Sequence, residues 1–82
     1  MTPSPIVAAL TRARIAARLA DGGPATQSWL ARKLGVSATT VSGWEVGRYD
    51  PAIGHAEAWA EALGLRLELL PALSVPEPEG EI

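Results

Sequence analysis

The sequence predicts a small all-α protein, a bundle of about four short helices followed by a short C-terminal β-strand. Apolar residues recur every three or four positions in four segments, which is the spacing of one helix face. Glycine follows each segment within a few residues, and glycine supplies the conformation that commonly ends a helix. After the fourth segment, leucine alternates with charged residues, which is the period of a strand with one apolar face. The expected helices are 6–20, 27–34, 38–45 and 53–63, and the expected strand is 65–71.

Composition bounds the class of protein. The chain has 82 residues, of which 48% are hydrophobic, so one compact domain can form around a core. Cysteine is absent, which excludes disulfides and thiolate metal sites, and the one histidine, His55, cannot build a histidine metal cluster. We read His55 as an isolated surface residue and expect no catalytic residue, metal or cofactor. No apolar run is long enough to span a bilayer and no signal peptide is recognisable, so we expect a soluble cytoplasmic protein with no membrane partner.

Charge is divided unevenly along the chain. Residues 1–50 hold six basic and three acidic side chains, whereas residues 51–82 hold one basic and six acidic ones. The overall net charge is -2, but a basic first half suits an anionic partner that approaches from one side.

Turn residues and composition also predict the domain organisation. Prolines near the N-terminus indicate a flexible lead-in over 1–5, because proline is unsuited to a helix interior. We expect a compact helical domain over 6–64, whose first helix turns an apolar stripe inward. The strand 65–71 follows, and the proline- and glutamate-rich segment 72–82 is expected to be an acidic disordered tail. The expected stripe of the first helix is Ile6, Leu10, Ile15 and Leu19.

The central stretch predicts two short helices joined by the tight turn Gly35-Val36-Ser37. Thr26 and Ser37 precede these helices and can cap them, since a hydroxyl oxygen accepts from free backbone N–H groups at a helix start. A shared apolar seam would lock the angle between the helices and push the second one outward, where its first residues can enter a major groove. The seam consists of Leu30, Ala31, Leu34, Val36, Val41 and Trp44.

This stretch resembles the Cro/repressor-type (lambda-repressor-like) helix-turn-helix family. The matching positions run without gaps from Thr26 to Leu65 and are Thr26-Gln27, Leu30-Ala31, Leu34-Gly35-Val36-Ser37, Trp44-Glu45-Val46-Gly47, Pro51 and Ala60-Glu61-Ala62-Leu63-Gly64. The resemblance implies a non-enzymatic, sequence-specific transcriptional regulator, a repressor or Cro-like protein. Such a protein binds a pseudo-palindromic operator in double-stranded DNA as a homodimer, with helix 38–45 in the major groove. The alternative is an antitoxin-like interaction module with autoregulatory DNA binding, whose acidic tail captures a protein partner.

The resemblance also implies the DNA-contacting residues. Gln27 would contact the DNA backbone, and the small residues of helix 38–45 would face the bases without making bidentate contacts. Gly43 is unusual, because glycine inside a helix costs about 1 kcal/mol relative to alanine. Either selection is relaxed at an exposed site, or the backbone approaches the groove wall there. The expected set is Gln27, Ser37, Ala38, Thr39, Thr40, Ser42, Gly43 and Arg48.

Three further roles concern contacts within the chain and between chains. The resemblance implies that Glu45 pairs with an arginine of the first helix, Arg18 as first choice and Arg14 as second. Trp29 would cover the loop near Ala25 or lie at an interface. The strand would pair antiparallel with its copy in a homodimer. The alternative is that this segment folds back as a short fifth helix within one subunit. The expected dimer interface is Leu65, Arg66, Leu67, Glu68 and Leu69.

Overall fold

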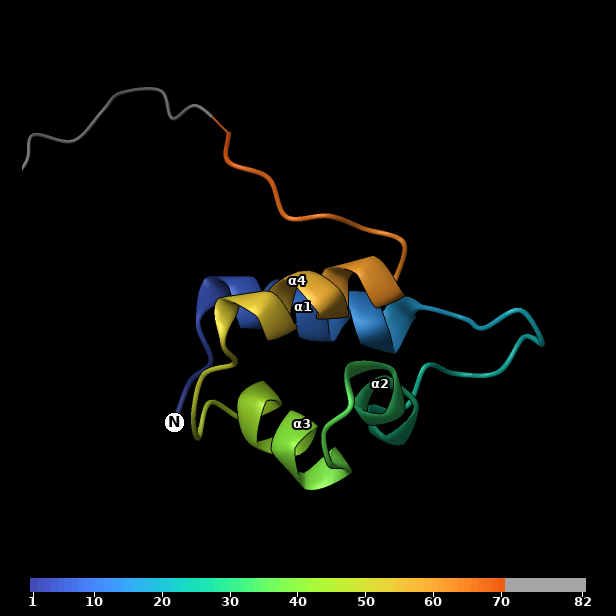
Figure 1. Cartoon of the computed structure of the whole chain (residues 1–82), viewed down its shortest axis with the longest axis horizontal. Helices are drawn as coiled ribbons and strands as arrows, with labels where there is room; N and C mark the ends of the chain where they lie inside the picture. Colours follow the sequence, from blue (N-terminus) through green and yellow to red (C-terminus); the bar gives the residue numbers. More distant parts are fainter. Residues whose placement is uncertain (71–82) are drawn as a thin grey trace, which may run out of the picture.

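Four α-helices in two layers make up the fold of the computed structural model, which describes residues 1–70. The first and last helices lie side by side, and the two central helices pack against them from one side (Figure 1). This arrangement confirms the predicted all-α class and the predicted number of helices. The helices are α1 (Pro5–Ala16), α2 (Gln27–Leu34), α3 (Ala38–Glu45) and α4 (Ile53–Ala62).

Side-chain caps fix where three of these helices begin. The Thr26 hydroxyl accepts from the backbone N–H of Trp29 at 3.0 Å, which confirms the predicted cap of α2. Ser37 caps α3 in the same way, as predicted. The third cap lies within the expected lead-in, where the Ser4 hydroxyl accepts from the Val7 N–H at 3.2 Å. Pro5 is therefore the first residue of α1, a position at which its missing N–H costs nothing.

Helix α1 ends at Ala16, four residues before the end that the sequence predicted. The chain then turns back on itself, since Arg18 and Pro24 form an isolated antiparallel bridge. The Leu19 N–H donates to the Gly23 carbonyl at 2.8 Å and closes this turn. These backbone bonds replace the helical ones that residues beyond Ala16 would otherwise make.

The buried face of α1 also differs from the expected stripe. Val7 and Leu10, three residues apart, are 3% and 4% exposed and form its core-facing side. Ile6 and Ile15 remain 56% and 61% exposed, so their predicted places in the core were wrong. Leu10 of the predicted stripe is buried, but the buried side of α1 is completed by Val7 rather than by Ile6, and Leu19 lies beyond the end of the helix.

The core lies between the two layers, around Trp59. Trp59 is fully buried, and its ring stacks on that of Trp44 with centroids 6.0 Å apart. The predicted seam between α2 and α3 is confirmed, because its residues are either buried or packed on this core. Ile53, the first residue of α4, is exposed. The buried cluster is Val7, Leu10, Leu30, Ala31, Val41, Trp44, Ala56, Trp59 and Ala60.

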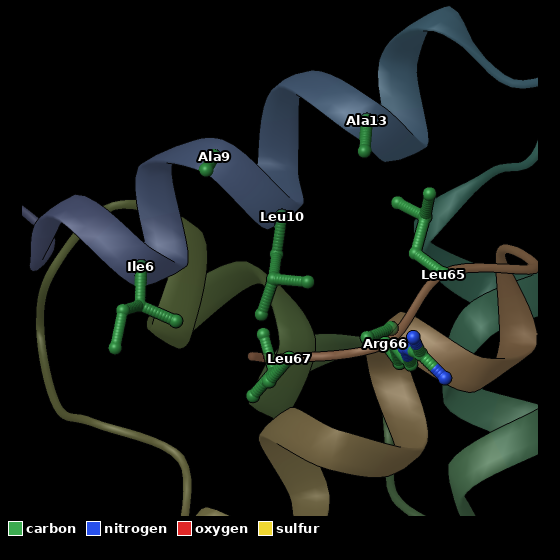
Figure 2. A pocket seen from close by; sticks show the side chains of 8 residues that line it. Ile6, Ala9, Leu10, Ala13, Leu65, Arg66 and Leu67 are labelled. Atoms are coloured by element: carbon green, nitrogen blue, oxygen red, sulfur yellow. The ribbon is translucent and has the colours of Figure 1, made fainter. Parts of the chain in front are cut away.

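Residues 65–70 form neither the predicted strand nor the alternative fifth helix, and residues 1–70 contain no strand. The helices beside this segment already use their backbone groups internally, so they offer no edge for strand pairing. The segment instead runs along α1 and α4 on the side away from α3 (Figure 1). Leu65 and Leu67 line a groove of about 210 Å³ there with Ile6 and Leu10 (Figure 2). Residue 71 and the expected acidic tail 72–82 lie outside the described residues.

Candidate nucleic-acid interface

The tight turn between α2 and α3 presents α3 at the surface of the molecule. Gly35 adopts φ 73° and ends α2, a left-handed conformation that glycine reaches without strain. Val41 and Trp44 then hold one side of α3 in the core, while Thr39 on another side is exposed. In Figure 1, α3 lies on the side of the molecule opposite to residues 65–70.

A nearly buried ion pair anchors the end of α3 to α1. Arg14 donates from Nε to Glu45 Oε2 at 2.6 Å and from Nη2 to Glu45 Oε1 at 2.8 Å. Its third group, Nη1, donates to the Ala25 carbonyl at 2.9 Å, which ties the loop before α2 to the same guanidinium. The two charged side chains are only 12% and 6% exposed. This geometry fixes the orientation of α3 relative to α1 and the loop.

The arginine of this pair is Arg14, so the first choice, Arg18, was wrong. Arg18 lies beyond the end of α1, where the chain has left the helical path. Its Nη1 donates to the backbone carbonyls of Ile15 at 3.2 Å and Ala17 at 2.9 Å. The early end of α1 therefore decides which arginine reaches Glu45.

Gln27, the first residue of α2, joins the same cluster. Its side-chain Nε2 donates to Glu45 Oε1 at 2.9 Å. A side-chain amide carries two N–H donors, so one remains for an acceptor such as a phosphate oxygen. The bond to Glu45 holds that donor in place beside the start of α2, where unpaired backbone N–H groups favour anions.

The hydroxyls at the start of α3 are largely engaged with each other. Ser37 Oγ accepts from the Thr40 backbone N–H at 3.1 Å and lies 2.8 Å from Thr40 Oγ1. These bonds cap the helix and leave the neighbouring Thr39 as the exposed hydroxyl of its first turn. Ala38 and Ser42 are half-buried.

Gly43 has a role that neither sequence interpretation included. It is buried, and a Cβ atom added there would lie 2.4 Å from both Cζ and Oη of Tyr49. Glycine at this position therefore makes room for the Tyr49 ring rather than for a groove wall. Sequence reasoning missed Tyr49, although a costly helix glycine shortly before a loop aromatic was an available signal.

Arg48 follows α3 on a fixed backbone. Gly47 adopts φ 81°, and the Arg48 N–H donates to the Gly43 carbonyl at 2.9 Å, so the helix ends in a tight turn. The backbone of Thr2 and Pro3 packs so closely on Gly47 that a Cβ atom there would lie 2.5 Å from the Thr2 carbonyl carbon. The Arg48 side chain itself is exposed.

The remaining aromatic and titratable candidates are structural. Trp29 is half-buried against the core, with Lys33 Nζ 5.8 Å from its ring centroid. His55 is not an isolated surface residue, because its ring centroid lies 5.3 Å from that of Trp44 and its side chain is half-buried. Residues 1–70 bring together no group of three metal-ligating side chains. Within the same range, no helix has the length and apolar character needed to cross a membrane.

Two capped helices at a fixed angle, with the second one presented at the surface, define a helix-turn-helix protein. The helix-turn-helix family of the Cro/repressor type matches residues 26–70, more than half of the chain, and the chain belongs to this family. Membership implies DNA binding, and members are typically transcriptional regulators rather than enzymes. No curated protein and no solved structure matches the chain.

Proposed function

We propose that the protein is a sequence-specific transcriptional regulator, a repressor or Cro-like protein, which binds a pseudo-palindromic operator as a homodimer. The observation that carries this proposal is the rigid presentation of α3. Its end is held by Glu45 and its start by the Ser37 cap, while Thr39 is free for contact. A helix presented in this way can enter the major groove with its N-terminal residues toward the bases.

Contacts to phosphate would position the protein on DNA. Arg48 is exposed directly after α3, and Gln27 has one free amide donor at the start of α2. Arg32 and Lys33 are both exposed in the last turn of α2, which leads into the start of α3, and would add positive charge there. Such contacts set orientation and affinity and carry no sequence information directly.

Contacts to bases would come from small side chains. Ala38, Thr39 and Ser42 offer methyl groups and hydroxyls but no long donor for a bidentate contact to guanine. The protein would therefore read thymine methyl groups and the local shape of the groove. We expect a consensus with little guanine dependence at the positions that face α3.

A homodimer would bring two recognition helices to one operator. One helix-turn-helix reads only a few base pairs, so two copies are generally needed for useful specificity. An apolar surface on the side away from α3 supports this part of the proposal, since Leu67 is 40% and Leu65 50% exposed beside the exposed Ile6. Leu69 is fully exposed.

Antiparallel pairing of residues 65–69 with their copy would cover this surface. The two strands would then satisfy each other's backbone groups, which helices α1 and α4 cannot do. The Arg66–Glu68 contact within one chain is long, at 3.8 Å, and both side chains are more than half exposed. With the two-fold axis near Leu67, Arg66 of each chain would lie opposite Glu68 of the other, and opposite charges across strands are mildly favourable.

Selection of bound sequences from random duplex DNA at a stated salt concentration tests the proposal. The selected duplex should be bound at least a thousandfold more tightly than a scrambled one, as is typical of specific regulators. The bound complex should contain two copies of the chain. Equal affinity for selected and scrambled duplexes would contradict a sequence-specific regulator.

A further inference from the structure

Tyr49 lies across the face of α3 that the proposed function turns toward DNA. Its ring covers Gly43, and its hydroxyl donates to the backbone carbonyl of Thr39 at 3.5 Å. Thr39 and Gly43 are four residues apart and therefore share one side of the helix. The ring thus spans this side from the last turn of α3 back to its first turn.

The contacts of Tyr49 leave much of it available to a partner. The side chain is 43% exposed, with one side of the ring on Gly43. The bond to Thr39 is at the limit of hydrogen-bond length, so it holds the hydroxyl only weakly. A phenol hydroxyl both donates and accepts, and bases present both kinds of group in the major groove.

We propose that Tyr49 is a specificity-determining residue that contacts a base edge through its hydroxyl. This inference rests on the proposed function and adds to it the one side chain of this face that is both long and polar. The hydroxyl lies beside Thr39 in the first turn of α3. The N-terminal residues of a recognition helix are the ones that reach the bases. Glycine at position 43 leaves space for the Tyr49 ring, since any larger residue would displace the ring.

Removal of the hydroxyl alone is the main test. Tyr49→Phe keeps the ring on Gly43, so the fold should be unchanged by circular dichroism and thermal unfolding. Affinity for the selected operator should fall roughly tenfold, while affinity for a scrambled duplex stays the same, because only the base contact is lost. The preference at one operator position should relax in a repeated selection.

A double-mutant cycle tests whether the contribution of Tyr49 to operator binding depends on glycine at position 43. Gly43→Ala adds a Cβ atom that would displace the ring, so it should weaken operator binding as much as Tyr49→Ala does. The double variant should lose no more than Tyr49→Ala alone, because the ring is already absent. The ring atoms nearest to the added Cβ are the far end of an exposed side chain, so Gly43→Ala should still fold.

Three results would overturn the inference. Unchanged operator affinity of Tyr49→Phe would show that the hydroxyl makes no base contact, and an equal loss on operator and scrambled duplex would show a phosphate contact instead. Losses of Gly43→Ala and Tyr49→Ala that add up would show independent roles. If any of these occurs while Arg48→Ala still weakens binding, the proposed function stands. A wild-type chain that prefers no duplex would overturn both.

Discussion

Arg14 and Glu45 join α1 to the end of α3 through two hydrogen bonds, of 2.6 and 2.8 Å. Both side chains are nearly buried, and Gln27 donates to the same carboxylate. Such a pair is stable only while it is complete, because a charge left alone in a poorly solvated site keeps its desolvation cost. The orientation of α3 therefore depends on a link between residues that are distant in the sequence.

Glu45→Gln should lower the free energy of unfolding by about 3 kcal/mol, since the Arg14 guanidinium would remain buried without its counter-charge. Chemical denaturation measures this loss. Glu61→Gln on α4 makes the same chemical change at an exposed site and should alter stability by less than about 0.5 kcal/mol. A loss from Glu45→Gln as small as that of the control would mean that the pair contributes little to the fold.

Which of Arg14 and Arg18 pairs with Glu45 could not be predicted from the sequence, whereas other features could. The Thr26 and Ser37 caps and the α2–α3 seam could be predicted because each depends on residues close together in the chain. The end of α1 depends instead on the turn that the Leu19–Gly23 bond closes, whereas alanine and apolar residues continue through Ala20 and gave no sign that the helix stops at Ala16.

The same limit applies at α3. The position of Gly43 on α3 follows from its helical spacing, but the return of Tyr49 over it depends on the turn at Gly47. The alternation of leucine with charged residues over 65–69 is likewise compatible with two structures. They suit a paired strand, and they also suit an extended segment that lays Leu65 and Leu67 against α1 and α4.

Gly43→Ala should stabilise the protein more when Tyr49 has been replaced by alanine than when it is present. Alanine is favoured over glycine inside a helix by about 1 kcal/mol, and this gain should appear in full once the ring is gone. With Tyr49 present, displacement of the ring offsets part of the gain. Thermal unfolding of the four proteins of this cycle measures the difference. An identical gain in both backgrounds would mean that the ring does not pack on Gly43.

Arg48→Ala should weaken binding to all duplexes by a similar factor and reduce the slope of log affinity against log salt by about one unit, because one phosphate contact is lost. Fluorescence anisotropy at several salt concentrations measures both effects. Arg18→Ala removes the same charge from the 17–26 loop, which projects away from α3, and should leave the slope unchanged (Figure 1). A slope that is the same for wild type and Arg48→Ala would contradict the proposed docking.

Leu69→Lys should convert the proposed homodimer to a monomer. Leu69 is fully exposed within one chain, so its replacement removes no packing inside the subunit. Lysine would instead place a charge in the apolar side of the paired strands, opposite Leu65 of the other chain. Leu67→Pro should have the same effect, because proline removes a donor from the strand ladder. Sedimentation velocity measures the assembly state, and both variants should also lose most of their operator affinity.

Leu70→Lys is the matched control for this experiment. Leu70 is 77% exposed but falls on the opposite side of the alternating pattern, so lysine there should leave the dimer intact. A dimer that survives Leu69→Lys and Leu67→Pro would exclude pairing through residues 65–69. Loss of the dimer in all three variants, Leu70→Lys included, would point to contact through both sides of the segment rather than to one strand with an apolar face.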